Sequence, residues 1–173
     1  MPEPRNLPLS RLAEKLVKTL IKNKLTLAAA ESCTGGLASE YLTRIPGASA
    51  VFWGSFITYT PDAKTKMLGI PGRKIEKYGA VSEPVALAMA LGALKRSGAS
   101  IAFSVTGLAG PGNDGSGTPV GTVWIGVADY VSQSCEAKSF LFHGSRGGIR
   151  EAAAAAAFRE ILKMIKTLKI NGA

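Results

Sequence analysis

The sequence predicts a single domain of the α/β class with a mixed β-sheet. Two apolar segments, residues 24–30 and 51–59, each run into residues that favour the start of a helix. Residues 120–128 and 134–142 are two further strand-like segments around a short turn, which predicts a hairpin. Strands that lead into helices and a hairpin in the same chain require a sheet with both parallel and antiparallel pairs.

Length and composition favour one globular domain. The 173 residues are enough for one full core, and we expect residues 10–168 to form it, with tails at 1–9 and 169–173. Hydrophobic residues make up 46% of the chain and charged residues 19%, which is typical of a globular protein. The amino-terminal residues lack the apolar core of a signal peptide, and the longest apolar run, 85–94, is too short to span a bilayer. We therefore expect a cytoplasmic protein without a membrane partner.

The net charge of +9 raises the question of nucleic-acid binding. Many of the basic residues lie at helical spacing opposite apolar residues, near the beginning and the end of the chain, and stacking aromatic residues are not interleaved with them. This is the pattern of a solvated helix face, and it argues against nucleic acid as the main partner. The positive surplus can still attract a small phosphorylated anion.

The chain begins with a predicted helix, strand and helix. Residues 10–23 carry apolar side chains at three-to-four spacing behind Ser10, which is a good N-cap. Residues 24–30 are apolar almost throughout, as a central strand covered on both faces should be. After a sharp turn, a helix is expected to open at Thr34 or Gly35 and to run to residue 44.

The middle of the chain predicts a strand followed by three helical segments. Residues 51–59 are rich in β-branched and aromatic side chains, which favours a strand. Pro61 suits the first position of a helix, and that helix is expected to end at Gly69. A brief segment at 71–78 precedes a longer helix that contains the small-residue run 85–94.

The last part of the chain predicts a strand, a glycine-rich loop, the hairpin and a long helix. Residues 100–105 form the strand, and 106–117 form a loop with many accessible N–H groups. The hairpin follows, and residues 148–168 form an amphipathic helix. The turns after the strands converge on one edge of the sheet, where open α/β folds bind ligands.

The residues at these turns suggest a serine nucleophile. Ser32 follows the first strand and lies beside the free N–H groups of a helix start, which suit a phosphate or an oxyanion. The single histidine, His143, has no acidic neighbour in sequence and is interpreted as a surface or packing residue. Lys64 can serve as the base if burial and a nearby helix N-terminus lower its pKa. Tyr59 could relay the proton or hold the lysine in place.

A purely structural interpretation of the same residues stays open. Ser32 could be an N-cap, Tyr59 an aromatic residue at a strand end, and Lys64 a solvated helix residue. No HExxH motif, cluster of cysteine and histidine, or Walker A motif occurs, so neither a metal site nor a cofactor is expected. The two cysteines, Cys33 and Cys135, lack CxxC spacing and are expected to be reduced thiols.

Five segments, in order along the chain, resemble the CinA C-terminal domain family, including its stand-alone nicotinamide-nucleotide amidases. They are AESCTGG at 30–36, TY with AK within 58–64, GAVSEP at 79–84, TGLAGP at 106–111 and PVGTV at 119–123. The resemblance implies a three-layer α/β/α sandwich with a mixed, mostly parallel β-sheet. It also implies hydrolysis of the carboxamide of nicotinamide mononucleotide to nicotinate mononucleotide and ammonia.

The resemblance assigns roles to particular residues. The family's catalytic serine, tyrosine and lysine match Ser32, Tyr59 and Lys64, with Ser32 attacking the carboxamide and Lys64 accepting and returning the proton. The N–H groups of residues 34–36 would hold the oxyanion, and Arg146 would bind the phosphate through its planar fork. The implied substrate-binding residues are Thr34, Gly35, Gly36, Thr106, Gly107, Gly110, Pro111, Gly112 and Arg146.

Two segments and the loop after Pro111 depart from the family pattern. Thr60-Pro61-Asp62 stands where many relatives carry Ser-Asn-Glu, and Ser145 stands before Arg146 where relatives often carry aspartate. We expect a homo-oligomeric amidohydrolase that acts on a small phosphorylated nucleotide. The alternative is a non-catalytic nucleotide-binding or regulatory module of the same fold, since a fold does not by itself imply turnover.

Overall fold

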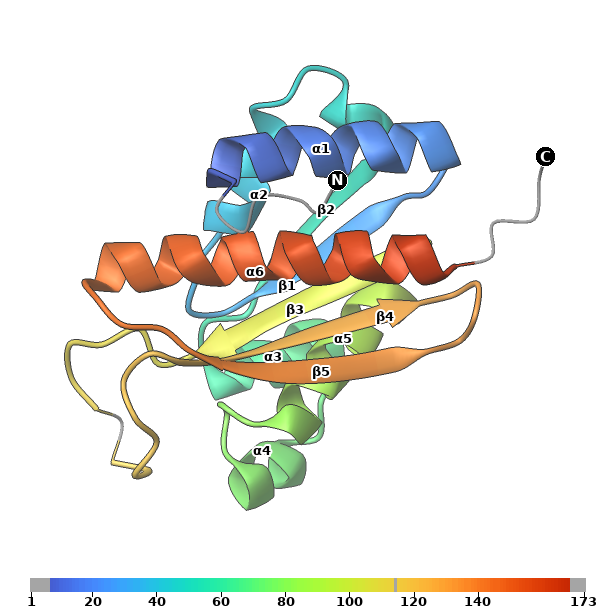
Figure 1. Ribbon diagram of the computed structural model, residues 1–173. Coiled ribbons are helices and arrows are strands. Elements are labelled where there is room, and N and C mark those ends of the chain that lie inside the picture. The colour runs from blue at the N-terminus through green and yellow to red at the C-terminus, as the bar shows by residue number, and fades with distance from the viewer. Residues whose placement is uncertain (1–6, 114, 169–173) are drawn as a thin grey trace.

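In the described part of the chain the sheet is mixed, with four of its five strands running in one direction. The structure is a computed structural model that describes residues 7–113 and 115–168, so most of both predicted tails lies outside the described residues. The strand order is β2-β1-β3-β4-β5, and β4 is antiparallel to both of its neighbours while β1 is parallel to β2 and β3 (Figure 1). The strands are β1 Leu27–Glu31, β2 Phe52–Ile57, β3 Ile101–Gly107, β4 Thr122–Asp129 and β5 Cys135–Leu141.

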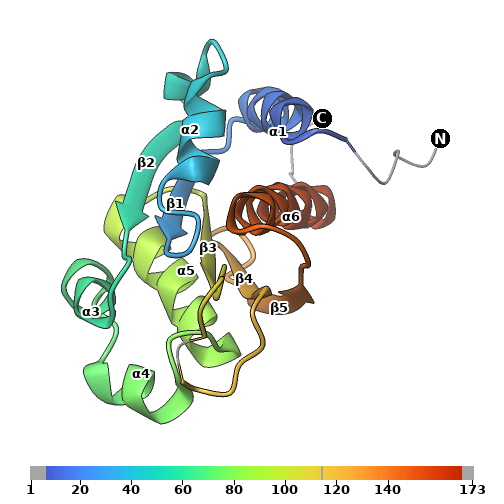
Figure 2. The ribbon, with the colours of Figure 1, turned by 90° about the vertical axis from the view of Figure 1, so that its left-hand side faces the viewer.

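Helices cover both faces of the sheet, which confirms the three-layer α/β/α sandwich (Figure 2). One face carries α1 Leu9–Asn23, α2 Leu37–Thr43 and α6 Arg146–Thr167, and the other carries α3 Pro61–Leu68, α4 Gly72–Tyr78 and α5 Glu83–Ser97. Side chains of β1 alternate between the two layers. Leu27 and Ala29 belong to the core under α1 and α6, whereas Ala28 and Ala30 belong to the core under α5.

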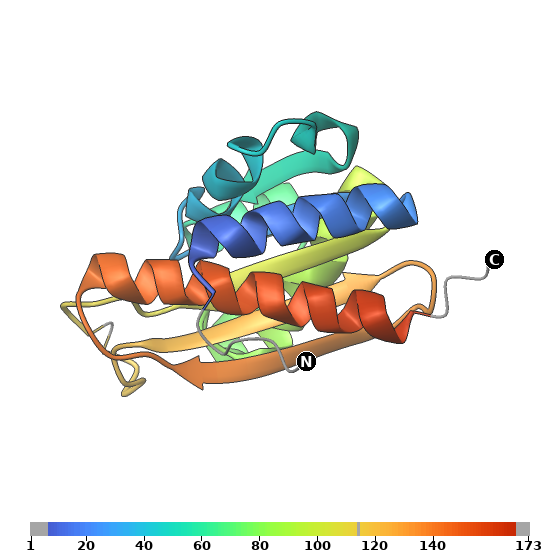
Figure 3. The ribbon, with the colours of Figure 1, turned by 45° about the horizontal axis from the view of Figure 1, so that its top comes forward.

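Small residues allow helix α6 to pack closely within its layer. Residues 153–157 are five consecutive buried alanines, and α6 lies beside α1 (Figure 3). The Phe158 ring meets Phe103 of β3 edge-on, with 6.3 Å between the ring centroids. Because α6 packs on both the sheet and α1, its alanines reduce the distance between layers while its larger side chains fill the core.

Helix α5 approaches the sheet so closely that the contact needs a glycine. A Cβ atom added at Gly126 of β4 would lie 2.7 Å from the Ala86 carbonyl oxygen and 2.7 Å from Ser104 Oγ. Ser104 is buried, and its hydroxyl donates to the Ala86 carbonyl at 2.7 Å while accepting the Gly126 N–H at 3.2 Å. One buried hydroxyl therefore joins β3, β4 and α5.

Several element boundaries differ from those predicted. Helix α1 begins at Leu9 and not behind Ser10, since the Leu12 N–H already donates to the Pro8 carbonyl. Lys24 lies in the left-handed region at φ 53° and ends α1, so β1 starts at residue 27. Helix α6 begins at residue 146, two residues early, because the Ser145 hydroxyl caps it by accepting the Gly148 N–H.

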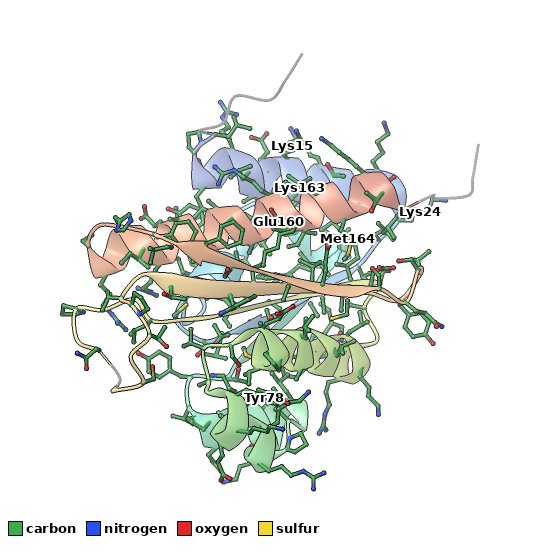
Figure 4. All side chains as sticks on the ribbon, turned by 60° about the horizontal axis from the view of Figure 1, so that its bottom comes forward. Lys15, Lys24, Tyr78, Glu160, Lys163 and Met164 are labelled. Carbon is green, nitrogen blue, oxygen red and sulfur yellow. The ribbon has the colours of Figure 1, made fainter. Side chains whose placement is uncertain are left out.

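The basic residues of α1, and Lys163 and Lys166 of α6, lie on the outer side of their layer, as predicted for a solvated face. On α1, Glu14 pairs with Arg11 at 3.0 Å and with Lys18 at 2.7 Å. On α6, Glu160 pairs with Lys163 and with Lys138 of β5, and Figure 4 shows Lys15 and Lys163 on these neighbouring helices. None of the helices in the described part of the chain is long and apolar enough to cross a membrane.

Candidate active site

The carboxyl ends of the three adjacent parallel strands β2, β1 and β3 meet at one edge of the sheet. Glu31, the last residue of β1, pairs with Ile57 at the end of β2 and with Val105 near the end of β3. In Figure 1 the β3 arrow points to the side on which α6 begins. A cavity of about 310 Å³ lies at this edge, lined by Ser32, Cys33, Tyr59, Lys64, Ala80, Val81, Thr106, Gly107, Leu108, Ala109 and Arg146.

This cavity brings together the side chains of Ser32, Lys64 and Arg146. A larger hollow of about 460 Å³ lies beside Phe52 and Trp53, near the amino end of β2, and is lined by no ionisable side chain. Chemistry at a protein site needs titratable or nucleophilic groups placed together. We therefore place the candidate active site in the smaller cavity.

Ser32 and Lys64 form a buried pair. The Lys64 Nζ lies 2.9 Å from Ser32 Oγ and 2.8 Å from the carbonyl oxygen of Thr58. Lys64 is 1% exposed, and no carboxylate of the described residues forms an ion pair with it. Burial lowers the pKa of Lys64 to about 8, because the charged form loses its hydration. The interpretation of Lys64 as a solvated helix residue is therefore wrong.

The start of α3 explains why Lys64 turns inward. Thr60 caps the helix, its hydroxyl accepting the Ala63 N–H at 3.1 Å, and Pro61 occupies the first helical position as predicted. Lys64 then lies on the first turn of α3, directly behind the end of β2. Its side chain reaches the Thr58 carbonyl and Ser32, and the alternative role of Ser32 as an N-cap is wrong because Gly36 precedes α2.

Glu31 occupies the N-terminus of helix α2, which begins at Leu37 and not at residue 34 or 35 as predicted. Its side chain is fully buried, and its carboxylate accepts the N–H groups of Gly36 at 3.0 Å, Ala38 at 3.2 Å and Ser39 at 2.9 Å. These are the unpaired donors that a helix N-terminus offers to an anion. The anion at this helix start is thus part of the protein.

The predicted oxyanion donors must be revised for this reason. The Gly36 N–H is bound to Glu31, and the Gly35 N–H donates to the Ser32 carbonyl at 3.0 Å. None of Thr34, Gly35 and Gly36 lines the cavity, whereas Cys33 does. Of the three predicted amides only Thr34 remains, and the Cys33 amide joins it, since no hydrogen bond of the described residues uses either N–H. The Thr34 hydroxyl is buried and also without a partner among the described residues.

Arg146 and Tyr59 bind each other at the mouth of the cavity. Arg146 donates from Nη2 to the Tyr59 hydroxyl at 3.0 Å and from Nη1 to the Gly110 carbonyl at 2.7 Å. Tyr59 is 57% exposed. The hydrogen bonds of the described residues do not join Tyr59 to Lys64, so Thr58, and not Tyr59, holds the lysine.

The glycine-rich loop contributes mainly through its first residues. Thr106 and Gly107 line the cavity, and the Thr106 hydroxyl donates to the Ala80 carbonyl at 2.8 Å. Gly110 reaches the site through its bond to Arg146, whereas Pro111 and Gly112 are exposed and do not line the cavity. The first residues of the loop thus form part of the cavity wall, and the Gly110 carbonyl binds Arg146.

Sequence reasoning missed Glu31, Thr58 and Arg150. The Arg150 guanidinium donates to the carbonyl of Cys33 at 3.2 Å and to that of Thr34 at 2.6 Å. A signal was present, because Arg150 lies four residues after Arg146 and so shares its helix face. His143, as expected, is exposed and outside the cavity lining. Across the described residues, no three His, Cys, Asp or Glu side chains gather as metal ligands.

Comparison with known proteins gives a consistent assignment of family. The model of the CinA C-terminal domain matches residues 9–165. A CinA-like protein of Chlorobaculum tepidum is 45% identical over 161 residues, which cover 91% of this chain and 38% of that protein. A CinA-like protein of Geotalea uraniireducens is 51% identical over 125 residues, or 72% of this chain and 29% of that protein. The chain thus spans less than half the length of these curated relatives.

Solved structures resemble the chain over nearly its whole length. A competence-damaged protein (CinA) superfamily protein of Escherichia coli has a TM-score of 0.88 at 31% identity, covering 95% of this chain and 94% of that one. A competence/damage inducible protein of Agrobacterium tumefaciens has a TM-score of 0.87 at 37% identity, covering 94% and 99%. On the family match, the relatives and the fold together, this chain belongs to the CinA C-terminal domain family.

Proposed function

We propose that this chain is an amidohydrolase that converts nicotinamide mononucleotide to nicotinate mononucleotide and ammonia. Ser32 is the nucleophile and Lys64 is the general base. The observation that carries this proposal is the buried contact of 2.9 Å between Ser32 Oγ and Lys64 Nζ. A nucleophile within hydrogen-bond reach of its base is the geometry that covalent catalysis requires.

The environment of Lys64 supports its role as a base. With its pKa lowered from 10.5 to about 8, the amine is neutral about a tenth of the time at pH 7, against about 0.03% for an ordinary lysine. A neutral amine can still donate one hydrogen to the Thr58 carbonyl while its lone pair accepts the proton of Ser32. The Thr58 carbonyl therefore orients the base toward the nucleophile.

The reaction then follows the steps of an acyl transfer. Ser32 Oγ attacks the carboxamide carbon, and its proton passes to Lys64. The developing oxyanion is bound by the free amides of Cys33 and Thr34, each donor typically stabilising it by about 3 to 4 kcal/mol. Lys64 returns the proton to the leaving ammonia, and water then hydrolyses the acyl-enzyme with Lys64 again as base.

The choice of substrate rests on the family resemblance and on the mouth of the cavity. The resemblance to stand-alone nicotinamide-nucleotide amidases supplies the nucleotide. Arg146, at the first position of α6, is placed to bind a phosphate, since cations and helix N-termini both attract anions. Tyr59, which binds Arg146, then has a role in holding the nucleotide.

Ammonia release from nicotinamide mononucleotide tests the proposal. The wild-type chain should release ammonia, whereas Ser32→Ala and Lys64→Met should lower kcat by at least about a thousandfold. A control is Ser39→Ala, which removes a hydroxyl that binds Glu31 outside the cavity and should leave turnover measurable. Turnover that survives both active-site substitutions would contradict the mechanism. Saturable nucleotide binding without wild-type turnover would favour the non-catalytic module.

A further inference from the structure

Arg150 binds the peptide groups that follow the nucleophile. It lies on α6, one turn after Arg146, and its Nε and Nη2 atoms donate to the carbonyls of Cys33 and Thr34 at 3.2 and 2.6 Å. No carboxylate of the described residues forms an ion pair with Arg150. Both contacts of this guanidinium therefore serve the turn and not a surface ion pair.

The first of these contacts fixes the direction of the Thr34 amide. In a planar trans peptide the C=O and the following N–H point in opposite directions. With the Cys33 carbonyl held toward Arg150, the Thr34 N–H must point away from Arg150. Cys33 lines the cavity beside Ser32 and Lys64.

The second contact, to the Thr34 carbonyl, fixes the direction of the next peptide in the same way. Arg150 holds the Thr34 carbonyl, and the N–H of that peptide, on Gly35, donates to the Ser32 carbonyl at 3.0 Å. Two consecutive peptides thus present their carbonyls to one guanidinium and their N–H groups away from it. Rotation of either peptide would break a bond to Arg150, because one planar fork spans both carbonyls.

We propose that Arg150 is a positioning residue that aims the Thr34 amide at the oxyanion formed when Ser32 attacks. This inference rests on the proposed function of Ser32 as a nucleophile, but not on the identity of the substrate. Preorganised donors lower a barrier only if they are already directed at the position of the developing charge. The guanidinium provides that order from outside the cavity, without touching the substrate.

A lysine at position 150 tests the geometry separately from the charge. Lysine keeps the positive charge but cannot span two carbonyls with a rigid fork. We expect Arg150→Lys to lower kcat for nicotinamide mononucleotide by about a hundredfold, the loss typical of a removed oxyanion donor, with KM changed less than about threefold. Arg159→Lys is the matched control, the same change on the same helix at a half-buried position away from the cavity, and should leave both constants unchanged.

A second readout separates this inference from the choice of substrate. A fluorophosphonate reagent phosphonylates an activated serine and places its phosphoryl oxygen where the oxyanion would lie, whatever the natural amide is. We expect rapid labelling of Ser32 in the wild type and in Arg159→Lys, and labelling slowed by at least about tenfold in Arg150→Lys. Mass spectrometry of the labelled peptide identifies Ser32 as the labelled residue. The rate at which unlabelled protein disappears gives the labelling rate.

The outcomes distinguish the two claims. Equal kcat and equal labelling in Arg150→Lys and the wild type would overturn the role of Arg150 and leave the proposed function standing. Labelling that depends on Arg150 in a protein that releases no ammonia would support the role of Arg150 and overturn the substrate. A wild type that is neither labelled nor active would overturn both. Should thermal unfolding show that Arg150→Lys does not fold, Arg150→Gln, which keeps an amide donor, takes its place.

Discussion

Lys64 carries its amine at the end of four methylene groups, and the whole residue is only 1% exposed to solvent. Among the described residues its two hydrogen-bond partners, the Thr58 carbonyl and Ser32, are uncharged. An ammonium without a carboxylate in such a place is costly, so the protein favours the neutral amine more than water does. The same burial that makes Lys64 a candidate base therefore lowers the stability of the fold at neutral pH.

The pH dependence of turnover should follow Lys64. Because the base must be neutral, kcat/KM is expected to rise with pH, to reach half of its maximum near the Lys64 pKa of about 8 and to level off above it. Initial rates measured from about pH 6 to about pH 10 on folded protein test this. A profile that is flat across the whole range would exclude Lys64 as the base.

Replacement of Lys64 by methionine should stabilise the protein while abolishing turnover. Lys64→Met keeps the chain length and removes the buried charge, so we expect a gain of about 1 to 3 kcal/mol at pH 7, reduced by the two lost hydrogen bonds. From pH 8 to 10.5 the unfolded wild type binds more protons than the folded one, so wild-type stability should rise with pH there and the gain should shrink. Urea unfolding of both proteins at two pH values measures this.

The strand-turn-helix element from β1 to α2 carries its own anion. Glu31 ends β1, and its carboxylate binds the Gly36, Ala38 and Ser39 amides at the start of α2. The N–H groups at the start of α2 are therefore bound by Glu31 of the same element and are not available to an outside anion. The amides left without a hydrogen bond among the described residues are those of Cys33 and Thr34, in the short turn between β1 and α2.

Glu31→Gln should destabilise this element strongly. The amide retains the shape of the side chain but removes the charge and places an NH₂ donor against backbone N–H donors, so we expect a loss of about 2 to 4 kcal/mol. Glu40→Gln, on the exposed side of the same helix and paired with Arg44, is the control and should cost less than about 1 kcal/mol. Similar losses in both variants would contradict the capping role of Glu31.

The order and type of the elements could be predicted from local patterns, and their exact ends could not. The apolar run before Ser32 and the Pro61 helix start are local signals, and both appear in the structure. The start of α2 is set by the Glu31 carboxylate, which no short-range propensity encodes. The hydrogen bond from Arg150 to the Cys33 carbonyl joins residues 117 positions apart, so the spacing of residues along the chain could not predict this contact.

At the scale of the molecule, the site depends on how closely three layers pack. Ser32 lies at the end of a central strand, Lys64 comes from the layer that contains α5, and Arg146 and Arg150 come from the opposite layer. The sequence predicted that the strand ends converge on one edge, and it placed Ser32 and Lys64 there. It could not predict that an arginine from the far layer would hold the turn, because this depends on the position of α6 over the sheet.

Substitution at the closest contact between layers should therefore destabilise the whole fold. Gly126→Ala would place a Cβ atom 2.7 Å from the Ala86 carbonyl and from Ser104 Oγ, so α5 or β4 must shift. We expect a loss of about 2 to 3 kcal/mol in denaturant unfolding. Gly72→Ala is the control, since a Cβ there meets nothing within 4 Å and the residue is helical. A loss that is equal at the two positions would show that the contact with α5 is not the cause.

The convergence of cations from separate layers has a consequence for the product. The proposed reaction turns a neutral carboxamide into a carboxylate while Lys64 and Arg146 still line the cavity. A carboxylate beside a protonated Lys64 is held more tightly than the amide was, so release of nicotinate mononucleotide should limit turnover when the lysine is charged. We expect product inhibition to be strong below the Lys64 pKa of about 8 and to weaken as pH rises through it. The inhibition constant of nicotinate mononucleotide, measured on either side of that pH, gives the magnitude of this effect.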